Sequence, residues 1–287
     1  MTAELSRIAG SLAPIDLDEL VSDAALLTRV DRKYLLPAAD AAHLLAAIDP
    51  ATRVLDIAGE RAFAYASVYF DTPDRLSYHL AARPRRRRFK LRTRAYLSSD
   101  TAYLEMKTRG GRGATVKDRI PYLTDHLDRL TPEGHRYVGE SLETIGLDPT
   151  LTREMRPTLT TRYRRTTLLA PGGSRATIDT ELDWIDAGGE RVGLPAHVII
   201  ESKSAGPATE IDRALWRLGH RPQGISKFGT GTAALHPELP SNKWARVLRD
   251  IFSDADHSVP PRASSAGPIP RRTAPHPHTP DSLEDAA

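Results

Sequence analysis

Cysteine is absent from the 287 residues of the chain. This absence excludes disulfide bonds, thiolate metal sites and catalysis by a cysteine nucleophile. The sequence also contains no G-x-x-x-x-G-K-[ST] phosphate loop and no G-x-S-x-G nucleophile elbow. It therefore gives no support to a P-loop nucleotide site or a serine hydrolase. The glycine-rich stretch Gly110–Gly113 joins two expected strands, so we interpret it as a hairpin turn.

Aromatic residues make up only 6% of the chain, although 40% of its residues are hydrophobic, which is enough for a sizeable core. No stretch approaches the roughly 18 consecutive apolar residues that a membrane span needs. Residues 1–16 lack the basic-then-apolar pattern of a secretory signal. We therefore expect a soluble, cytoplasmic protein without a membrane span.

The net charge is small, +3, but arginine is locally concentrated, as in the run Arg85–Arg88. Such a run fits a nucleic-acid patch, a basic funnel for polyanions or a solvated turn before a strand. The stacking aromatic residues that single-strand binders use are not interleaved there. We favour the solvated turn and expect no nucleic-acid partner.

Most of the chain alternates polar and apolar residues with the period of a β-strand. In residues 87–97, for example, Phe89 and Leu91 face one side, and Lys90 and Arg92 the other. The predicted strands are 28–36, 63–70, 87–97, 102–108, 114–123, 156–169, 174–184 and 197–204. The predicted helices are 15–26, 37–48, 132–146, 207–218 and 240–252. This order indicates an α+β protein with an antiparallel sheet flanked by helices.

One face of nearly every predicted strand is charged. The charged faces contain Asp31, Lys33, Lys90, Arg92, Arg94, Glu105, Lys107, Lys117, Arg119, Arg165, Arg175, Asp179, Glu201 and Lys203. Two arrangements fit this pattern: an open sheet whose polar face meets water, or a closed barrel with a basic interior. The face is rich in Arg and Lys and sparing in Ser and Thr, which favours the barrel. Crowded cations in such a lumen would need a polyanion as counter-charge, because unit charges about 4 Å apart interact by roughly 4 kcal/mol at an effective dielectric of 20.

The few carboxylates on this face need a separate explanation, because a bound polyanion would repel them. A divalent cation held by carboxylate and phosphate oxygens would remove that repulsion, as Mg²⁺ or Mn²⁺ does in many sites. Glu201 is the first candidate ligand, Glu105 the second and Asp179 the third. The alternative is that each carboxylate simply pairs with a neighbouring arginine.

Eight short motifs occur in an order that resembles the VTC domain, the polyphosphate-polymerase branch of the triphosphate tunnel metalloenzymes. They are SVYFDT (67–72), KLRTRAY (90–96), YLEMKT (103–108), VKDRI (116–120), YRRT (163–166), RATIDTEL (175–182), IIESK (199–203) and SKF (226–228). The resemblance covers roughly residues 25–236. It implies a tunnel-shaped antiparallel β-barrel with a polar, basic interior and flanking helices.

The resemblance also implies a function, a polymerase that transfers the γ-phosphate of ATP onto a polyphosphate chain with Mn²⁺ or Mg²⁺. The implied roles are catalysis by Arg92, Arg94 and Lys107, phosphate binding by Lys33, Lys90, Lys117, Arg165, Lys203 and Lys227, and metal binding by Glu201 and Glu105. Two features depart from the family pattern: the segment SKFGTG lacks a second lysine, and RVDRKY replaces the acidic E-x-E-x-K signature. These departures leave the reaction open between polymerisation and triphosphate hydrolysis.

Two alternatives to a polymerase, a hydrolase and a binding module, remain open. A hydrolase would use a carboxylate to orient water, with Glu105 as the candidate, whereas a binding module would hold polyphosphate without turnover. We expect an N-terminal helical segment (1–24), a tunnel domain (25–252) and a disordered tail (253–287), whose removal from about residue 255 should leave activity unchanged. A partner that anchors the domain to a membrane or granule is left open.

Overall fold

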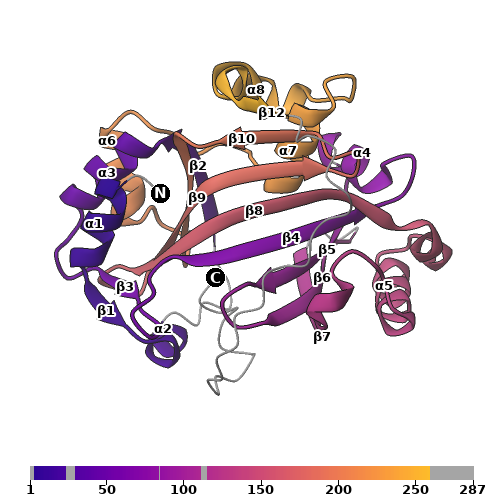
Figure 1. The fold of residues 1–287 in the computed structure, drawn as a ribbon, viewed down its shortest axis with the longest axis horizontal. Helices are drawn as coiled ribbons and strands as arrows, with labels where there is room; N and C mark the ends of the chain where they lie inside the picture. Colours follow the sequence, from indigo (N-terminus) through magenta and orange to yellow (C-terminus); the bar gives the residue numbers. More distant parts are fainter. Residues whose placement is uncertain (1–2, 24–29, 84, 111–114, 259–287) are drawn as a thin grey trace.

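The computed structural model describes residues 3–23, 30–83, 85–110 and 115–258 (Figure 1). Its strands are β1 Ala13–Ile15, β2 Val30–Pro37, β3 Arg53–Leu55, β4 Phe63–Asp71, β5 Arg88–Tyr96, β6 Thr101–Arg109, β7 Thr115–Tyr122, β8 Arg156–Leu169, β9 Arg175–Asp186, β10 Arg191–Leu194, β11 His197–Ser204 and β12 Asp256–Ser258. Its α-helices are α1 Ala3–Ser11, α2 Leu17–Asp23, α3 Ala38–Ala47, α4 Leu76–Ala82, α5 Pro132–Thr144, α6 Glu210–Arg217, α7 Lys227–Leu235 and α8 Ala245–Asp250. Short 3-10 turns cover Thr124–His126, Pro149–Glu154, Asn242–Trp244 and Phe252–Asp254.

One large sheet joins all these strands. Its main path runs β2, β11, β9, β8, β4, β5, β6, β7, and all pairs along it are antiparallel. The long strand β9 pairs with β8 on one side and with both β11 and β10 on the other. Figure 1 shows β4, β8 and β9 running side by side across the molecule, with α1, α3 and α6 towards one end and α5 towards the other.

The expected antiparallel sheet with flanking helices is confirmed, but the expectation of a closed ring is corrected, because the sheet is curled and not closed. Within the described part of the chain, β2 pairs only with β11 and β7 only with β6, so the two edges do not join. The curling still brings distant strands together. Lys90 of β5 is close enough to Lys33 of β2 for their charges to interact.

Apolar clusters on the convex side of the sheet explain where the helices lie. Leu44, Ile200 and Leu215 belong to a cluster in which α1, α3 and α6 cover β2, β9 and β11. Leu91 and Val138 belong to a second cluster, in which α5 covers β5 and β6. Because strand residues alternate between faces, burying these residues outside turns their charged neighbours to the concave side.

The structure differs from the predicted elements mainly in short segments. Residues 240–252 form two short turns and α8 instead of one helix, and α4 and α7 were not predicted, whereas α1 lies inside the N-terminal segment that was expected to be helical. Asp256–Ser258 pair with β10, so the first residues of the predicted tail form an edge strand. Residues 259–287 and most of the predicted Gly110–Gly113 turn lie outside the described residues. None of the described helices is long and apolar enough to cross a membrane.

Candidate phosphate-binding face

The registers place the charged residues of neighbouring strands side by side on the concave surface. We call this set the cationic face. It consists of Lys33, Lys90, Arg92, Arg94, Lys107, Lys117, Arg119, Arg165, Arg175, Lys203 and Lys227, with the carboxylates Asp31, Glu105, Asp179 and Glu201 among them. Cations outnumber carboxylates on this surface.

Asp179 lies at the centre of the face, where β8, β9 and α7 meet. Arg165 donates two hydrogen bonds of 2.7 and 2.9 Å to its carboxylate, and the Lys227 ammonium forms an ion pair with the same group. Burial would raise the pKa of Asp179, but Arg165 and Lys227 outweigh burial and lower the pKa to about 2. Asp179 is thus an anion that holds two cations in place.

Glu105 organises a second group of cations on β5, β6 and β7. Arg92 contacts its carboxylate at 2.5 and 2.6 Å, Arg94 at 3.5 Å and Lys117 at 3.9 Å. Glu105 is only 2% exposed, so this carboxylate is shielded from water by the arginines around it. The geometry of Glu105 therefore matches the alternative, in which the carboxylate pairs with neighbouring arginines.

Glu201 forms the third such group, on the strand pair β2–β11. Lys33 lies directly opposite on β2 and its ammonium is 2.5 Å from the carboxylate. Burial would raise the pKa of Glu201, but Lys33 and Lys203 overcome it and hold the pKa well below the ordinary value. The Glu201 side chain keeps 17% exposure, more than Glu105 or Asp179.

Lys90 has a different environment, because the charges that shift its pKa are all positive. Burial, together with the charges of Lys107, Lys243, Lys33 and Arg88, lowers the pKa of Lys90 to about 7. Its ammonium also lies 5.9 Å from the centre of a phenylalanine ring, which is a weak attraction compared with an ion pair. This end of the cationic face therefore has a surplus of positive charge.

Helix α7 packs closely against Trp184 of β9, and this packing directs Lys227 towards the cationic face. Ser226 caps the helix by accepting from the Gly229 amide at 3.0 Å, and the Trp184 indole donates to the Lys227 carbonyl at 2.9 Å. A Cβ at Gly231 would lie 2.1 Å from Trp184, so only glycine allows this approach. The glycines of SKFGTG therefore have a packing role.

Aromatic and hydroxyl side chains complete the concave surface. Tyr65 and Tyr163 stack at 5.2 Å, and the Arg165 guanidinium lies 5.4 and 5.3 Å from their rings. Ser67 and Thr161 are opposite each other and fully buried. The expectation that this face is sparing in Ser and Thr is therefore wrong for β4 and β8. In the sequence, aromatic neighbours obscured the alternation that places these two residues on the face.

The structure gathers nearly all the predicted site residues on one surface, but not equally. Arg92, Arg94, Arg165, Lys203 and Lys227 are shielded or buried within it. Lys107 and Lys117 lie on the same surface at exposed positions of β6 and β7. Lys33 and Lys90 lie on this surface as well, and so do the predicted metal ligands Glu105 and Glu201. In the arginine run, Arg85 to Arg87 are exposed and Arg88 begins β5.

Four residues on or beside this surface were missing from the predicted site: Arg119, Asp31, Arg175 and Lys243. Lys203 lies between Asp31 on β2 and Arg175 on β9, so both share its face. Their alternation in the sequence already placed them on a charged face. Lys243 is different: it comes from a short turn near α4, donates to the Ala81 carbonyl at 2.9 Å, and has no sequence signal.

The described carboxylates of this face do not form a cluster of metal ligands. In the described residues, no three His, Cys, Asp or Glu side chains are grouped so that they could hold a metal ion. Each candidate carboxylate is instead paired with at least one cation. The described residues therefore do not provide a metal site built by the protein alone.

Comparison with known protein families shows the family to which the chain belongs. A family model described as the VTC domain matches residues 28–236. The chain belongs to the VTC domain family. The matched range of this VTC domain protein includes all the residues of the cationic face and excludes α1 and α8.

Solved structures with similar shape share little sequence with this VTC domain protein. A putative adenylyl cyclase from Hippeastrum with a dominant triphosphatase activity is 18% identical, with 75% of this chain and 99% of that chain covered and a TM-score of 0.47. A protein of Pyrococcus horikoshii is 13% identical, with 70% and 95% covered and a TM-score of 0.39. A putative adenylate cyclase from Vibrio parahaemolyticus is 13% identical, with 67% and 83% covered and a TM-score of 0.34. The search among curated proteins gave no match.

Proposed function

We propose that this VTC domain protein is a metal-dependent phosphotransferase that moves the γ-phosphate of ATP onto a polyphosphate chain. The observation that carries the proposal is the surplus of cations on a curled, partly buried face. Lys90 shows it most clearly, because Lys107, Lys243 and Lys33 all lower its pKa. A chain of phosphates supplies the missing negative charge, and a charge-assisted bond to each phosphate contributes about 1.5–3 kcal/mol.

The chemistry requires positioning and charge neutralisation more than a protein nucleophile. A terminal phosphate oxygen of the chain attacks the γ-phosphorus and forms a new P–O bond. The bond from the γ-phosphorus to the β–γ bridging oxygen breaks, and ADP leaves with the electron pair. In our proposal Arg92, Arg94 and Lys107 neutralise the charge on the transferring group.

The other cations bind the flanking phosphates in this proposal. They are Lys33, Lys90, Lys117, Arg165, Lys203 and Lys227, which lie along the face from β2 to β7. Lys227 and Arg165 are already oriented by Asp179, so little side-chain conformational freedom is lost when phosphate binds.

A divalent cation, Mn²⁺ or Mg²⁺, would neutralise phosphate charge when bound together with the substrate. Glu201 is the proposed carboxylate ligand because its side chain is the most exposed of the three acids, and phosphate oxygens supply the other ligands. Glu105 is the second candidate, although Arg92 and Arg94 hold it more tightly.

Incubation of the purified protein with ATP and Mn²⁺ tests the proposal. Long phosphate chains, separated on a gel, are the expected product together with ADP. Release of orthophosphate alone would instead identify a triphosphate hydrolase of the same fold. Tight, salt-dependent binding of polyphosphate with no turnover would identify a binding module.

Glu201→Gln separates a catalytic from a binding role, because it removes one negative charge with little change of shape. We expect loss of chain synthesis with retained binding of polyphosphate. Asp183→Asn is the matched control, since Asp183 pairs with the half-exposed Arg191 away from the cationic face. Unchanged synthesis in Glu201→Gln would contradict the metal-binding role.

A further inference from the structure

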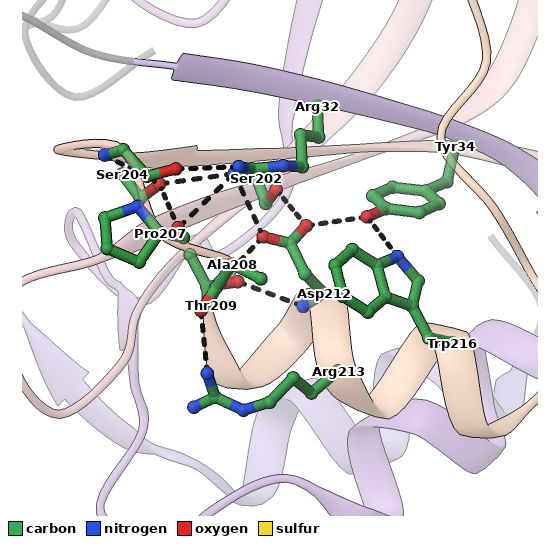
Figure 2. Close-up of polar contacts among 11 residues, drawn as sticks. Arg32, Tyr34, Ser202, Ser204, Pro207, Ala208, Thr209, Asp212, Arg213 and Trp216 are labelled. Atoms are coloured by element: carbon green, nitrogen blue, oxygen red, sulfur yellow. Dashed lines mark hydrogen bonds and ion pairs between the residues drawn. The ribbon is translucent and has the colours of Figure 1, made fainter.

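A buried carboxylate on the convex side of the sheet is directly connected to the strands that carry Lys33 and Glu201. Asp212, in the first turn of α6, is 0% exposed and accepts four hydrogen bonds (Figure 2). The donors are the Tyr34 hydroxyl at 2.7 Å, the Ser202 hydroxyl at 2.5 Å, the Thr209 amide at 2.7 Å and the Arg32 guanidinium at 3.4 Å.

These donors come from two strands and the start of one helix. Arg32 and Tyr34 belong to β2, and Ser202 belongs to β11. Thr209 caps α6, with its hydroxyl accepting from the Asp212 amide at 3.0 Å. One carboxylate therefore joins β11 and α6, which are close in the chain, to β2, which is distant from both in the sequence.

The surrounding contacts leave this network well satisfied. The Trp216 indole donates to the Tyr34 hydroxyl at 3.1 Å, and Arg32 also donates to the Gly206 carbonyl at 2.7 Å (Figure 2). Burial and the neighbouring Asp212 raise the pKa of Tyr34 well above its ordinary value, so its hydroxyl stays a donor. The network is a structural device and offers no site for a ligand.

Its position matters because strand residues alternate. Arg32 and Tyr34 flank Lys33, and Ser202 lies between Glu201 and Lys203. A slip of one residue in the pairing of β2 with β11 would turn Lys33 to the opposite face. Within the described residues β2 pairs with no strand other than β11, so its backbone register has a single partner.

We propose that Asp212 is a positioning residue, whose carboxylate fixes β2 against β11 and thereby keeps Lys33 on the cationic face. It touches neither substrate nor the concave surface, and it acts through the strand pair. The part of this inference that concerns phosphate affinity rests on the proposed function.

The test compares Asp212→Asn with Leu5→Ala, a destabilising change in the same apolar cluster but on α1. Binding of tripolyphosphate is measured by calorimetry well below both unfolding temperatures. We expect Asp212→Asn to weaken binding about tenfold and Leu5→Ala to change it less than about twofold, because only the first alters the strand pair. If Asp212→Asn does not fold, Tyr34→Phe and Ser202→Ala are used in its place, because each removes one hydrogen-bond donor to Asp212.

A double-mutant cycle with Lys33→Met shows whether Asp212 acts through Lys33. In the Lys33→Met background, Asp212→Asn should cause little further loss of tripolyphosphate affinity. Full additivity, or wild-type affinity in Asp212→Asn, would overturn the inference. Restored affinity in Asp212→Glu would support it.

Hydrogen exchange gives a readout that does not depend on phosphate. Asp212→Asn should speed amide exchange in residues 30–37 and 197–204, whereas Leu5→Ala should speed it in residues 3–11. Unchanged exchange in β2 and β11 would refute the positioning role. If the wild-type protein binds no tripolyphosphate, the proposed function fails, while this measurement still decides the role of Asp212.

Discussion

At the scale of single residues, each buried carboxylate of the cationic face lies directly opposite a cation on a neighbouring strand. Asp179 faces Arg165, Glu105 faces Arg92, and Glu201 faces Lys33. Such pairs need good geometry to offset the loss of hydration, and removing one partner leaves an uncompensated buried charge. The acids therefore orient cations that would otherwise repel one another.

Asp179→Asn should reduce the free energy of unfolding by about 3–5 kcal/mol, because it leaves Arg165 and Lys227 without their anion. The folded pKa, about 2, lies below the ordinary value of 3.8, so Asp179 stabilises the fold above that value and this contribution is lost as the pH falls towards 2. Urea unfolding between pH 2 and 7 measures both effects, and the variant should show a weaker acid dependence.

Asp183→Asn is the control on the same strand, because Asp183 also pairs with an arginine but Arg191 is 45% exposed. We expect a loss below about 1 kcal/mol there. Equal losses of unfolding free energy in the two variants would show that the buried pair contributes no more to stability than the exposed one.

Lys90 should take up a proton when a polyanion binds. Its free pKa of about 7 leaves it largely neutral at pH 8, and nearby phosphate would raise that pKa. Affinity for tripolyphosphate should therefore fall as the pH rises from 7 to 9. Calorimetry at pH 8 in two buffers with different ionisation enthalpies measures the uptake.

Lys90→Arg is the matched variant, since a guanidinium stays charged throughout this range. Its complex should form with less proton uptake and a flatter pH dependence. The same uptake in both proteins would assign the proton to another group, including the ligand itself.

At the scale of elements, α7 is held between two tryptophans. A Cβ at Gly229 would lie 2.3 Å from Trp244, and one at Gly231 would lie 2.1 Å from Trp184. Because the Lys227 carbonyl accepts from Trp184, any outward shift of α7 moves Lys227 away from Asp179. Close packing of a helix thus controls one charge of the face.

Gly231→Ala should destabilise the protein by about 1–3 kcal/mol through overpacking and weaken tripolyphosphate binding at the same time. Gly224→Ala is the control, because a Cβ there meets nothing within 4 Å. Thermal unfolding and binding calorimetry give the two readouts. A stable Gly231→Ala protein with normal affinity would contradict the seating of α7.

At the scale of the whole molecule, curling brings β2 and β5 near each other although they are distant in the sheet order. The chain beyond the matched family range contributes α8 and the edge strand β12, which pairs with β10 on the side of β9 away from β8. Val247 of α8 belongs to the same apolar cluster as Trp184 and Phe252.

Truncation after Ser258 should leave both the unfolding temperature and tripolyphosphate binding unchanged, since every described contact is kept. Truncation after Ala255 removes the β10–β12 pairing and should lower the unfolding temperature by a few degrees without changing affinity. A loss of binding of more than about tenfold in either protein would show that the C-terminal residues act at the cationic face.

The sequence predicted the longer elements well, because period-two alternation over eight or more residues is a strong signal. It placed Arg92 and Arg94 on the charged face of β5 and Arg165 on that of β8. It missed α7, because glycines at 229 and 231 are poor helix formers whose presence makes sense only beside Trp184 and Trp244.

The amino-acid sequence by itself determined the strand faces and the surplus of basic residues, because alternation is a local property of the chain. Only the tertiary structure decided that Glu201 meets Lys33 and that Asp179 meets Lys227, because these pairs depend on cross-strand register and helix packing. It also decided that the sheet curls without closing, since edge pairing is set by contacts between distant segments.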